Sequence, residues 1–305
     1  MRNAHPGPRH VMGEALLRRD GEGEGSRTQN YWEIGGRAFF AAILCAMMVT
    51  VAVADAAKKP PVPVGVDPGG VAVALIGEGV DYTRPEIAKR LARDGEGEII
   101  GWDFVDGDRR PYRADGSRAF EVIAGEASAA RMTVFRTASG DNRLSFANAI
   151  AMVWVGPARI VLMGGERTEA GAAEPDRELL SAAGEHFSDL LFVAPAGEGA
   201  VGGPEPVDLK AIANVVIVAA TEAAEGTAGA DLAASGKLGN NATASAVAAA
   251  RIAALAARIA ASEPGIKAAE LKQRIVALAK PFPDGVAKVA RHGWIEDPAG
   301  VAVGK

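Results

Sequence analysis

The chain has 305 residues, of which 49% are apolar, so it is long enough for one large domain or two small ones with buried cores. Of its 33 Lys and Arg and 38 Asp and Glu, the first 54 residues hold six and five, which leaves 27 against 33 in the remainder. This balance is mildly acidic, and no block of charge along the chain suggests a nucleic-acid partner. The only cysteine, Cys45, excludes disulfides and thiol chemistry from everything after it.

The N-terminal region predicts export. Residues 1–37 form a polar leader rich in Gly, Arg and Glu, and residues 38–54 form an apolar run that follows Arg37 and ends in the small-x-small pattern of Ala52 and Ala54. A basic residue, an apolar stretch and this ending are typical of a secretory signal cleaved near Ala54. We therefore expect a periplasmic or secreted protein. The alternatives are an uncleaved membrane anchor, since 17 residues approach the length of a span, and a lipoprotein through Cys45.

Residues 55–70 are rich in Pro and Gly and predict an extended linker, so the domain should occupy residues 71–305. Short apolar runs then alternate with helical stretches, which is typical of a doubly wound α/β domain with a mostly parallel sheet and helices on both faces. The expected strands are 71–76, 98–104, 131–136, 159–163, 190–194 and 214–219. The expected helices are 85–93, 118–124, 144–155, 176–187, 242–262 and 268–278.

The helix ending at residue 262 is expected to cross the centre of the domain. Of the twenty residues 242–261, twelve are alanine, the best helix former and the side chain that allows the closest packing. Arg251 and Arg258 stand seven residues apart on one face, which predicts one narrow solvent-exposed stripe. Two arginines in the apolar run also argue against a membrane span in the mature domain.

The order of short motifs resembles the subtilisin-like serine proteases. The carrying segments are VALIGEGVDY at 73–82, GWDFV at 101–105, ADGSRAFEVIAG at 114–125, FVAPAGEG at 192–199 and GNNATASAVAAA at 239–250, and the closing segment 291–301 is similar as well. They correspond in turn to the family's aspartate strand, the segment after it, its histidine helix, its oxyanion strand and its serine helix. The resemblance implies a subtilisin-like fold for residues 70–303.

The same resemblance places non-catalytic residues at every position of the family's site. The aspartate position is Gly77, the histidine position Asp115, the oxyanion asparagine Glu198 and the serine position Asn241. Acyl transfer requires a nucleophile, a base that accepts its proton and donors for the oxyanion, and an amide side chain is no nucleophile. A carboxylate at the oxyanion position would oppose the developing charge. The resemblance therefore implies a pseudoprotease.

Two interpretations stay open for the acids at this site. Glu78, Asp115 and Glu198 are expected to converge near Asn241. They are either neutral replacements at a solvated cleft or a group that binds a cation or the basic end of a peptide. No other cofactor is expected.

The functional alternatives are a non-catalytic scaffold that binds a peptide or protein, and a divergent endopeptidase that uses carboxylates at low pH. Asp115 and Glu198 faintly resemble the acids of the sedolisins, relatives that nevertheless keep the serine. The turn Asp106-Gly107-Asp108 is a further candidate cation loop, although such turns are common. The two histidines of the domain, His186 and His292, are expected at the surface.

Overall fold

The computed structural model describes residues 59–77, 79–114, 118–137, 143–163, 177–196, 212–222, 229–237, 244–283 and 288–303. All of them belong to one compact unit, Lys58–Lys305.

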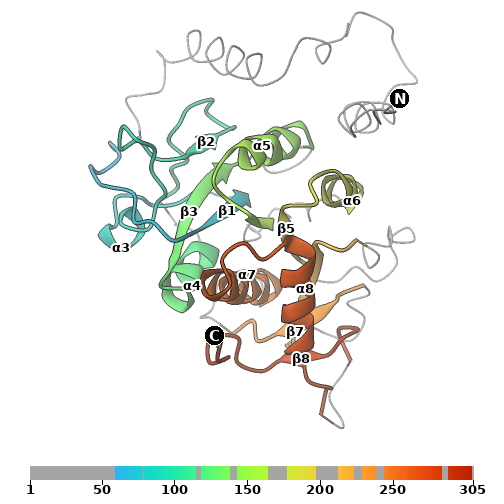
Figure 1. Ribbon diagram of the computed structural model, residues 1–305. Helices are drawn as coiled ribbons and strands as arrows, with labels where there is room; N and C mark the ends of the chain where they lie inside the picture. The colour runs from blue at the N-terminus through green and yellow to red at the C-terminus, as the bar shows by residue number, and fades with distance from the viewer. Residues whose placement is uncertain are drawn as a thin grey trace, which may run out of the picture. The chain divides into compact units, whose positions relative to one another are not determined.

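A single parallel sheet forms the frame of this unit (Figure 1). Its strands follow the order β2-β3-β1-β4-β5-β6-β7-β8. The chain passes from β1 to the outer strand β2, returns to β3 between them, and then continues from β4 to β8 on the other side of β1. The seven pairs of neighbouring strands are all parallel. The strands are β1 (Val71–Gly77), β2 (Gly101–Asp103), β3 (Ala130–Arg136), β4 (Ile160–Met163), β5 (Leu191–Pro195), β6 (Val215–Ala220), β7 (Leu232–Ala234) and β8 (Trp294–Ile295).

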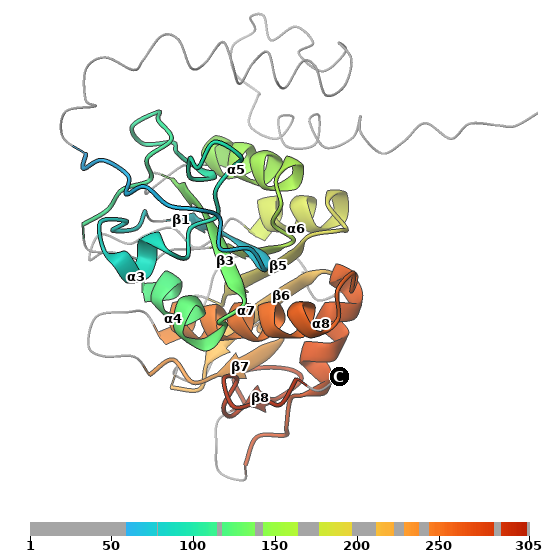
Figure 2. The ribbon, with the colours of Figure 1, turned by 60° about the vertical axis from the view of Figure 1, so that its left-hand side comes forward.

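Helices cover both faces of the sheet, as Figure 2 shows, with α5 and α6 on one side and α4, α7 and α8 on the other. Both coverings are needed because the strands are buried along nearly their whole length and would otherwise expose apolar side chains on two faces. The helices are α3 (Pro85–Ala88), α4 (Arg118–Glu126), α5 (Arg143–Val155), α6 (Arg177–His186), α7 (Ala244–Ser262) and α8 (Ala268–Ala277). The predicted doubly wound α/β architecture is confirmed.

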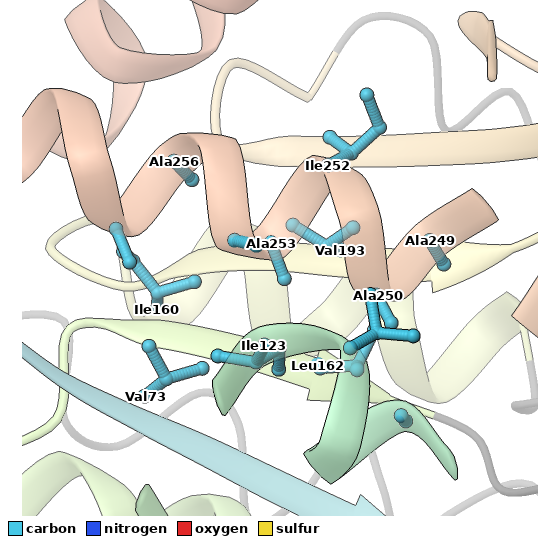
Figure 3. Close-up of a cluster of buried hydrophobic side chains, with 14 of the residues drawn as sticks. Val73, Ile123, Ile160, Leu162, Val193, Ala249, Ala250, Ile252, Ala253 and Ala256 are labelled. Carbon is cyan, nitrogen blue, oxygen red and sulfur yellow. The ribbon is translucent and has the colours of Figure 1, made fainter. Parts of the chain in front are cut away.

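Helix α7 is the core helix that its alanines predict. Ala249, Ala250 and Ala253 have no exposed surface and lie against the strands beneath them (Figure 3). Short side chains allow the helix to approach the sheet closely, so Val193 of β5 and Ile160 of β4 fill the space beside them. Among the helices that the structure describes, only α7 has the length and hydropathy of a membrane span, and its burial identifies a core helix.

The two arginines of α7 do not form the open stripe that their spacing predicts. Arg251 Nε lies 3.4 Å from the Glu126 carboxylate of α4, and the Arg251 side chain is only 18% exposed. The Arg258 guanidinium donates to the carbonyl oxygens of Pro298, Ala299 and Val301. Both side chains fold back because these carboxylate and carbonyl oxygens lie within their reach, so they fasten α4 and the C-terminal segment to α7.

Two elements depart from their predicted boundaries by three or more residues because tertiary pairing overrides local preference, and one strand was not predicted. Helix α3 ends at Ala88 instead of residue 93, since the next residues pair with β3 through Met132. Strand β2 starts at Gly101 instead of residue 98, because Ile99 pairs in antiparallel fashion with Arg93. Strand β7 was not predicted, because three residues of Leu and Ala give no periodic signal.

Candidate functional site

The candidate site lies at the carboxyl edge of the sheet. In open α/β sheets, ligands bind outside the carboxyl ends of the strands where the winding direction changes. Here that change occurs at β1, whose last residue, Gly77, pairs with Arg136 at the end of β3. Asp103 at the end of β2 pairs with the same Arg136. Where β1, β3 and β2 end, this edge is therefore formed by a glycine, an arginine and an aspartate.

Gly77 stands at the position where the family resemblance implies the orienting aspartate. It offers only its backbone, and the Thr137 N–H donates to its carbonyl oxygen at 2.7 Å. Its φ of +152° lies in a region that side-chain-bearing residues rarely adopt. The structure thus places no acid at this position. The other predicted site residues, Glu78, Asp115, Glu198 and Asn241, lie outside the described residues, so their convergence stays a prediction.

A network of charged side chains surrounds Asp103 at the end of β2 and includes Arg136, the residue that pairs with Gly77. The Lys59 ammonium lies 2.7 Å from Asp103 Oδ2, 2.8 Å from Asp106 Oδ2 and 3.1 Å from Asp108 Oδ1. Arg136 Nη1 lies 2.8 Å from both Asp103 Oδ2 and Asp106 Oδ2. The Asp103 side chain has no exposed surface. A carboxylate buried this completely is tolerated because both its oxygens accept hydrogen bonds from charged or backbone donors.

Lys59 and the aspartates of this network stabilise one another's charged forms, as the shifts in their pKa values show. Burial alone would lower the pKa of Lys59, but its hydrogen bonds to Asp103, Asp106 and Asp108 outweigh that effect and raise it. The hydrogen bond from Lys59 lowers the pKa of Asp106, with Arg136 adding to the effect. Both groups are therefore charged at neutral pH.

The Asp106-Gly107-Asp108 turn, which the sequence offers as a candidate cation loop, is part of this network. Its carboxylates do bind a cation, but the cation is the chain's own lysine, 47 to 49 residues earlier in sequence. With Lys59 in place, no group of His, Cys, Asp and Glu among the described residues is arranged to hold a metal ion. Sequence reasoning missed Lys59 because a lysine inside a Pro-rich linker carries no signal of a partner so far along the chain.

The two histidines of the domain lie at the opposite edge of the sheet. His186 ends α6 just before the amino end of β5, and its ring packs edge-on against Phe187 at 4.8 Å. His292 is exposed, and its backbone N–H donates to the carbonyl oxygen of Asp231, the residue before β7. In a parallel sheet all amino ends meet at one edge, away from Gly77. Neither histidine is placed to act beside Gly77.

Sequence reasoning also overlooked Glu222, which follows β6 at the carboxyl edge. Its carboxylate accepts hydrogen bonds from Ser235 Oγ at 2.9 Å and from the Gly236 N–H at 2.8 Å. Burial would raise the pKa of Glu222, but these hydrogen bonds lower it. Gly236 is required there, because a Cβ would lie 2.3 Å from the carbonyl oxygen of Ala244 at the start of α7. Glu222 thus fixes the connection that leads into α7.

The strand order, the crossover helices and the buried α7 define a subtilisin-like α/β fold. A cold-adapted subtilisin-like serine proteinase superposes with a TM-score of 0.56 at 16% identity, covering 78% of this chain and 93% of that one. MycP1 from Mycobacterium smegmatis gives 0.51 at 17% identity, covering 79% and 82%. A chain of the periplasmic assembly from the ESX-5 inner membrane complex gives 0.54 at 16% identity, covering 78% and 81%.

No protein-family model and no curated protein sequence matches the chain. At 16 to 17% identity the likeness to solved structures establishes the fold and leaves the chemistry to the residues themselves.

Proposed function

We propose that this protein is an exported subtilisin-fold pseudoprotease, which binds a peptide or protein without cleaving it. The observation that carries the proposal is the placement of the two groups that a serine protease needs beside its nucleophile. Gly77 ends β1 where the acid would stand, and His186 and His292, the only histidines after residue 54, both lie at the other edge of the sheet.

The chemistry of acyl transfer explains why this placement matters. A serine hydroxyl attacks a peptide carbonyl only when a base takes its proton, and an acid must orient that base. Arg136, the residue that pairs with Gly77, and Lys59 beside it are held by Asp103 and Asp106 and accept no proton at neutral pH. The residue expected at the serine position, Asn241, carries an amide, which is not a nucleophile.

A binding role is consistent with what the fold retains. The described residues of β4 pair with β1 on one side and β5 on the other. Gly164 and Gly165 follow β4 in the sequence, outside the described residues, where the family resemblance places the continuation of the substrate-binding strand. We expect their backbone to pair with an extended peptide through main-chain hydrogen bonds. One structural neighbour is part of a periplasmic assembly. These points support a protein partner outside the cytoplasm, in agreement with the predicted export signal.

The test is cleavage of a randomised peptide pool by the purified chain from pH 3 to pH 9. We expect every peptide to remain intact, whereas a fraction of the pool is retained on the protein and identified by mass spectrometry. A serine-directed phosphonate should leave the mass of the protein unchanged.

Cleavage at acid pH would instead indicate the divergent endopeptidase. The assignment to this site then requires that Asp115→Ala or Glu198→Ala abolish the activity. The matched control is Glu185→Ala, because Glu185 is an exposed acid on α6. Cleavage that all three variants retain would point to a contaminating protease.

A further inference from the structure

The segment before β1 is fastened along the domain by side chains from several elements. We call residues 59–67 the strap. The Tyr82 hydroxyl, fully buried, donates to the Pro60 carbonyl oxygen at 3.0 Å, and Arg93 Nη2 donates to the Pro63 carbonyl oxygen at 2.8 Å. At its far end the Asp67 carboxylate accepts from the Arg93 N–H at 2.9 Å and pairs with Arg131. The strap is thus an integral part of the domain.

Lys59 at the start of the strap has surroundings that resemble those of a bound cation. Three carboxylate oxygens and the carbonyl oxygen of Arg110, at 2.9 Å, converge on its ammonium. The carboxylates come from residues 103–108, which we call the acidic loop. The Lys59 side chain is only 9% exposed, so water contributes little to the solvation of its charge. Sets of carboxylate and carbonyl oxygens are the ligands that hard metal ions prefer.

The acidic loop needs this charge. Asp103, Asp106 and Asp108 approach the same point, and like charges in a poorly hydrated place repel one another strongly. Arg136 neutralises part of the charge but contacts only Asp103 and Asp106. Asp108 depends on Lys59 and on Arg110, whose guanidinium is 3.8 Å away.

We propose that Lys59 is a built-in cation, a latch that ties the strap to the acidic loop and occupies the position that a divalent metal ion would otherwise take. Wild-type protein is then closed and independent of metal, whereas loss of Lys59 frees the strap and leaves an anionic loop that binds a divalent cation. This inference is independent of whether the protein cleaves peptides.

The latch also defines where N-terminal processing has to stop. The apolar run predicted as an export signal ends at Ala54, five residues before Lys59. Cleavage there preserves the latch, and trimming beyond Lys59 removes it. The N-terminal boundary of the mature chain thereby decides whether the acidic loop is closed by lysine.

The experiment compares the melting temperature of the full chain and its Lys59→Met variant with calcium chloride from 0 to 10 mM or with EDTA. For wild type we expect the same value in all conditions. Lys59→Met should melt lower by on the order of 10 °C, since removing one partner of a buried pair strands the others. Calcium should recover about half of this loss. Lys89→Met, which removes an exposed lysine of the same unit, is the control and should change by about 1 °C or less.

Several results would overturn the proposal. A Lys59→Met protein as stable as Lys89→Met would show that the latch contributes nothing. A lowered melting temperature that calcium does not raise would refute the exchange of lysine for metal. A wild-type protein that calcium stabilises as much as the variant would show that the loop binds metal with Lys59 in place.

A second variant covers the case in which Lys59→Met does not fold. Lys59→Met combined with Asp106→Asn removes one cation and one carboxylate together, so less repulsion remains in the acidic loop. We expect this double variant to fold and to melt below wild type. Calcium should raise its melting temperature by less than the recovery expected for Lys59→Met, because two carboxylates remain instead of three. A double variant that melts like wild type would overturn the latch.

Discussion

Two aspartates are equally buried in this domain, yet their surroundings differ. Asp103 at the carboxyl edge accepts hydrogen bonds on both oxygens, from Lys59, from Arg136 and from two backbone N–H groups. Asp231 at the amino edge accepts one hydrogen bond on Oδ2, from the Ile217 N–H at 3.0 Å, and its Oδ1 has no hydrogen-bond partner. The side chains are 0% and 1% exposed.

Distance to the neighbouring cations makes the same distinction. The cations beside Asp103 lie at 2.7 and 2.8 Å, whereas Lys272 and Arg291 each remain 3.9 Å from Asp231. A buried charge is stabilised by direct hydrogen bonds far more than by cations just beyond their reach. Asp103 is therefore held more tightly than Asp231.

The largest effect is expected from Asp103→Asn. An amide cannot neutralise Lys59 and Arg136, and its NH₂ group would face their donors, so we expect a loss of about 3–5 kcal/mol in the free energy of unfolding. Urea denaturation followed by circular dichroism measures it. Asp189→Asn, at an exposed aspartate, is the control and should change the value by less than about 0.5 kcal/mol. Equal losses in the two variants would refute the structural role of Asp103.

A smaller effect is expected from Asp231→Asn. The amide oxygen can still accept from the Ile217 N–H, and only the longer attractions to Lys272 and Arg291 are lost. We expect a loss of about 1–2 kcal/mol in the same urea measurement. A loss as large as that of Asp103→Asn would mean that cations at 3.9 Å stabilise a buried carboxylate as well as direct hydrogen bonds do, and the comparison would fail.

The sequence predicted what depends on local pattern. Continuous apolar runs gave the strands, and the alanines of α7 gave the core helix, because packing between layers requires those side chains wherever the elements lie. The shortened α3 depends on the pairing of Leu91 with Met132, 41 positions away, and the ion pair of Lys59 with Asp103 joins residues 44 positions apart. No local pattern records such contacts. Of the residues predicted at the protease-like site, only Gly77 is among those the structure describes, and it offers no acid.

The smallest effects concern pH, and Lys59 and Lys272 are expected to respond with opposite signs. Burial alone would lower the pKa of Lys59, but its hydrogen bonds to Asp103, Asp106 and Asp108 outweigh burial and raise the pKa above its ordinary 10.5. The folded state then holds the proton more tightly than the unfolded state. Its contribution to stability is fully present below pH 10.5 and is lost only as the pH rises above that value.

Lys272 behaves in the reverse way, because burial lowers its pKa below 10.5 and the nearby Arg291 adds to the effect, while Asp231 offsets only part of it. The unfolded state binds the proton more tightly, so the contribution of Lys272 grows as the pH rises towards 10.5. We expect the stability difference between wild type and Lys272→Met to shift in favour of wild type from pH 7 to pH 10, by less than the ~1.4 kcal/mol per pH unit of one full proton.

The same urea series on Lys59→Met supplies the contrast, since its difference from wild type should stay constant over this range. Parallel curves for the two variants would mean that both lysines hold their protons alike, and that Asp231 is as well neutralised as Asp103. Divergent curves would show that one lysine is a permanent cation of the fold, whereas the other is a buried amine held beside a carboxylate that it does not fully reach.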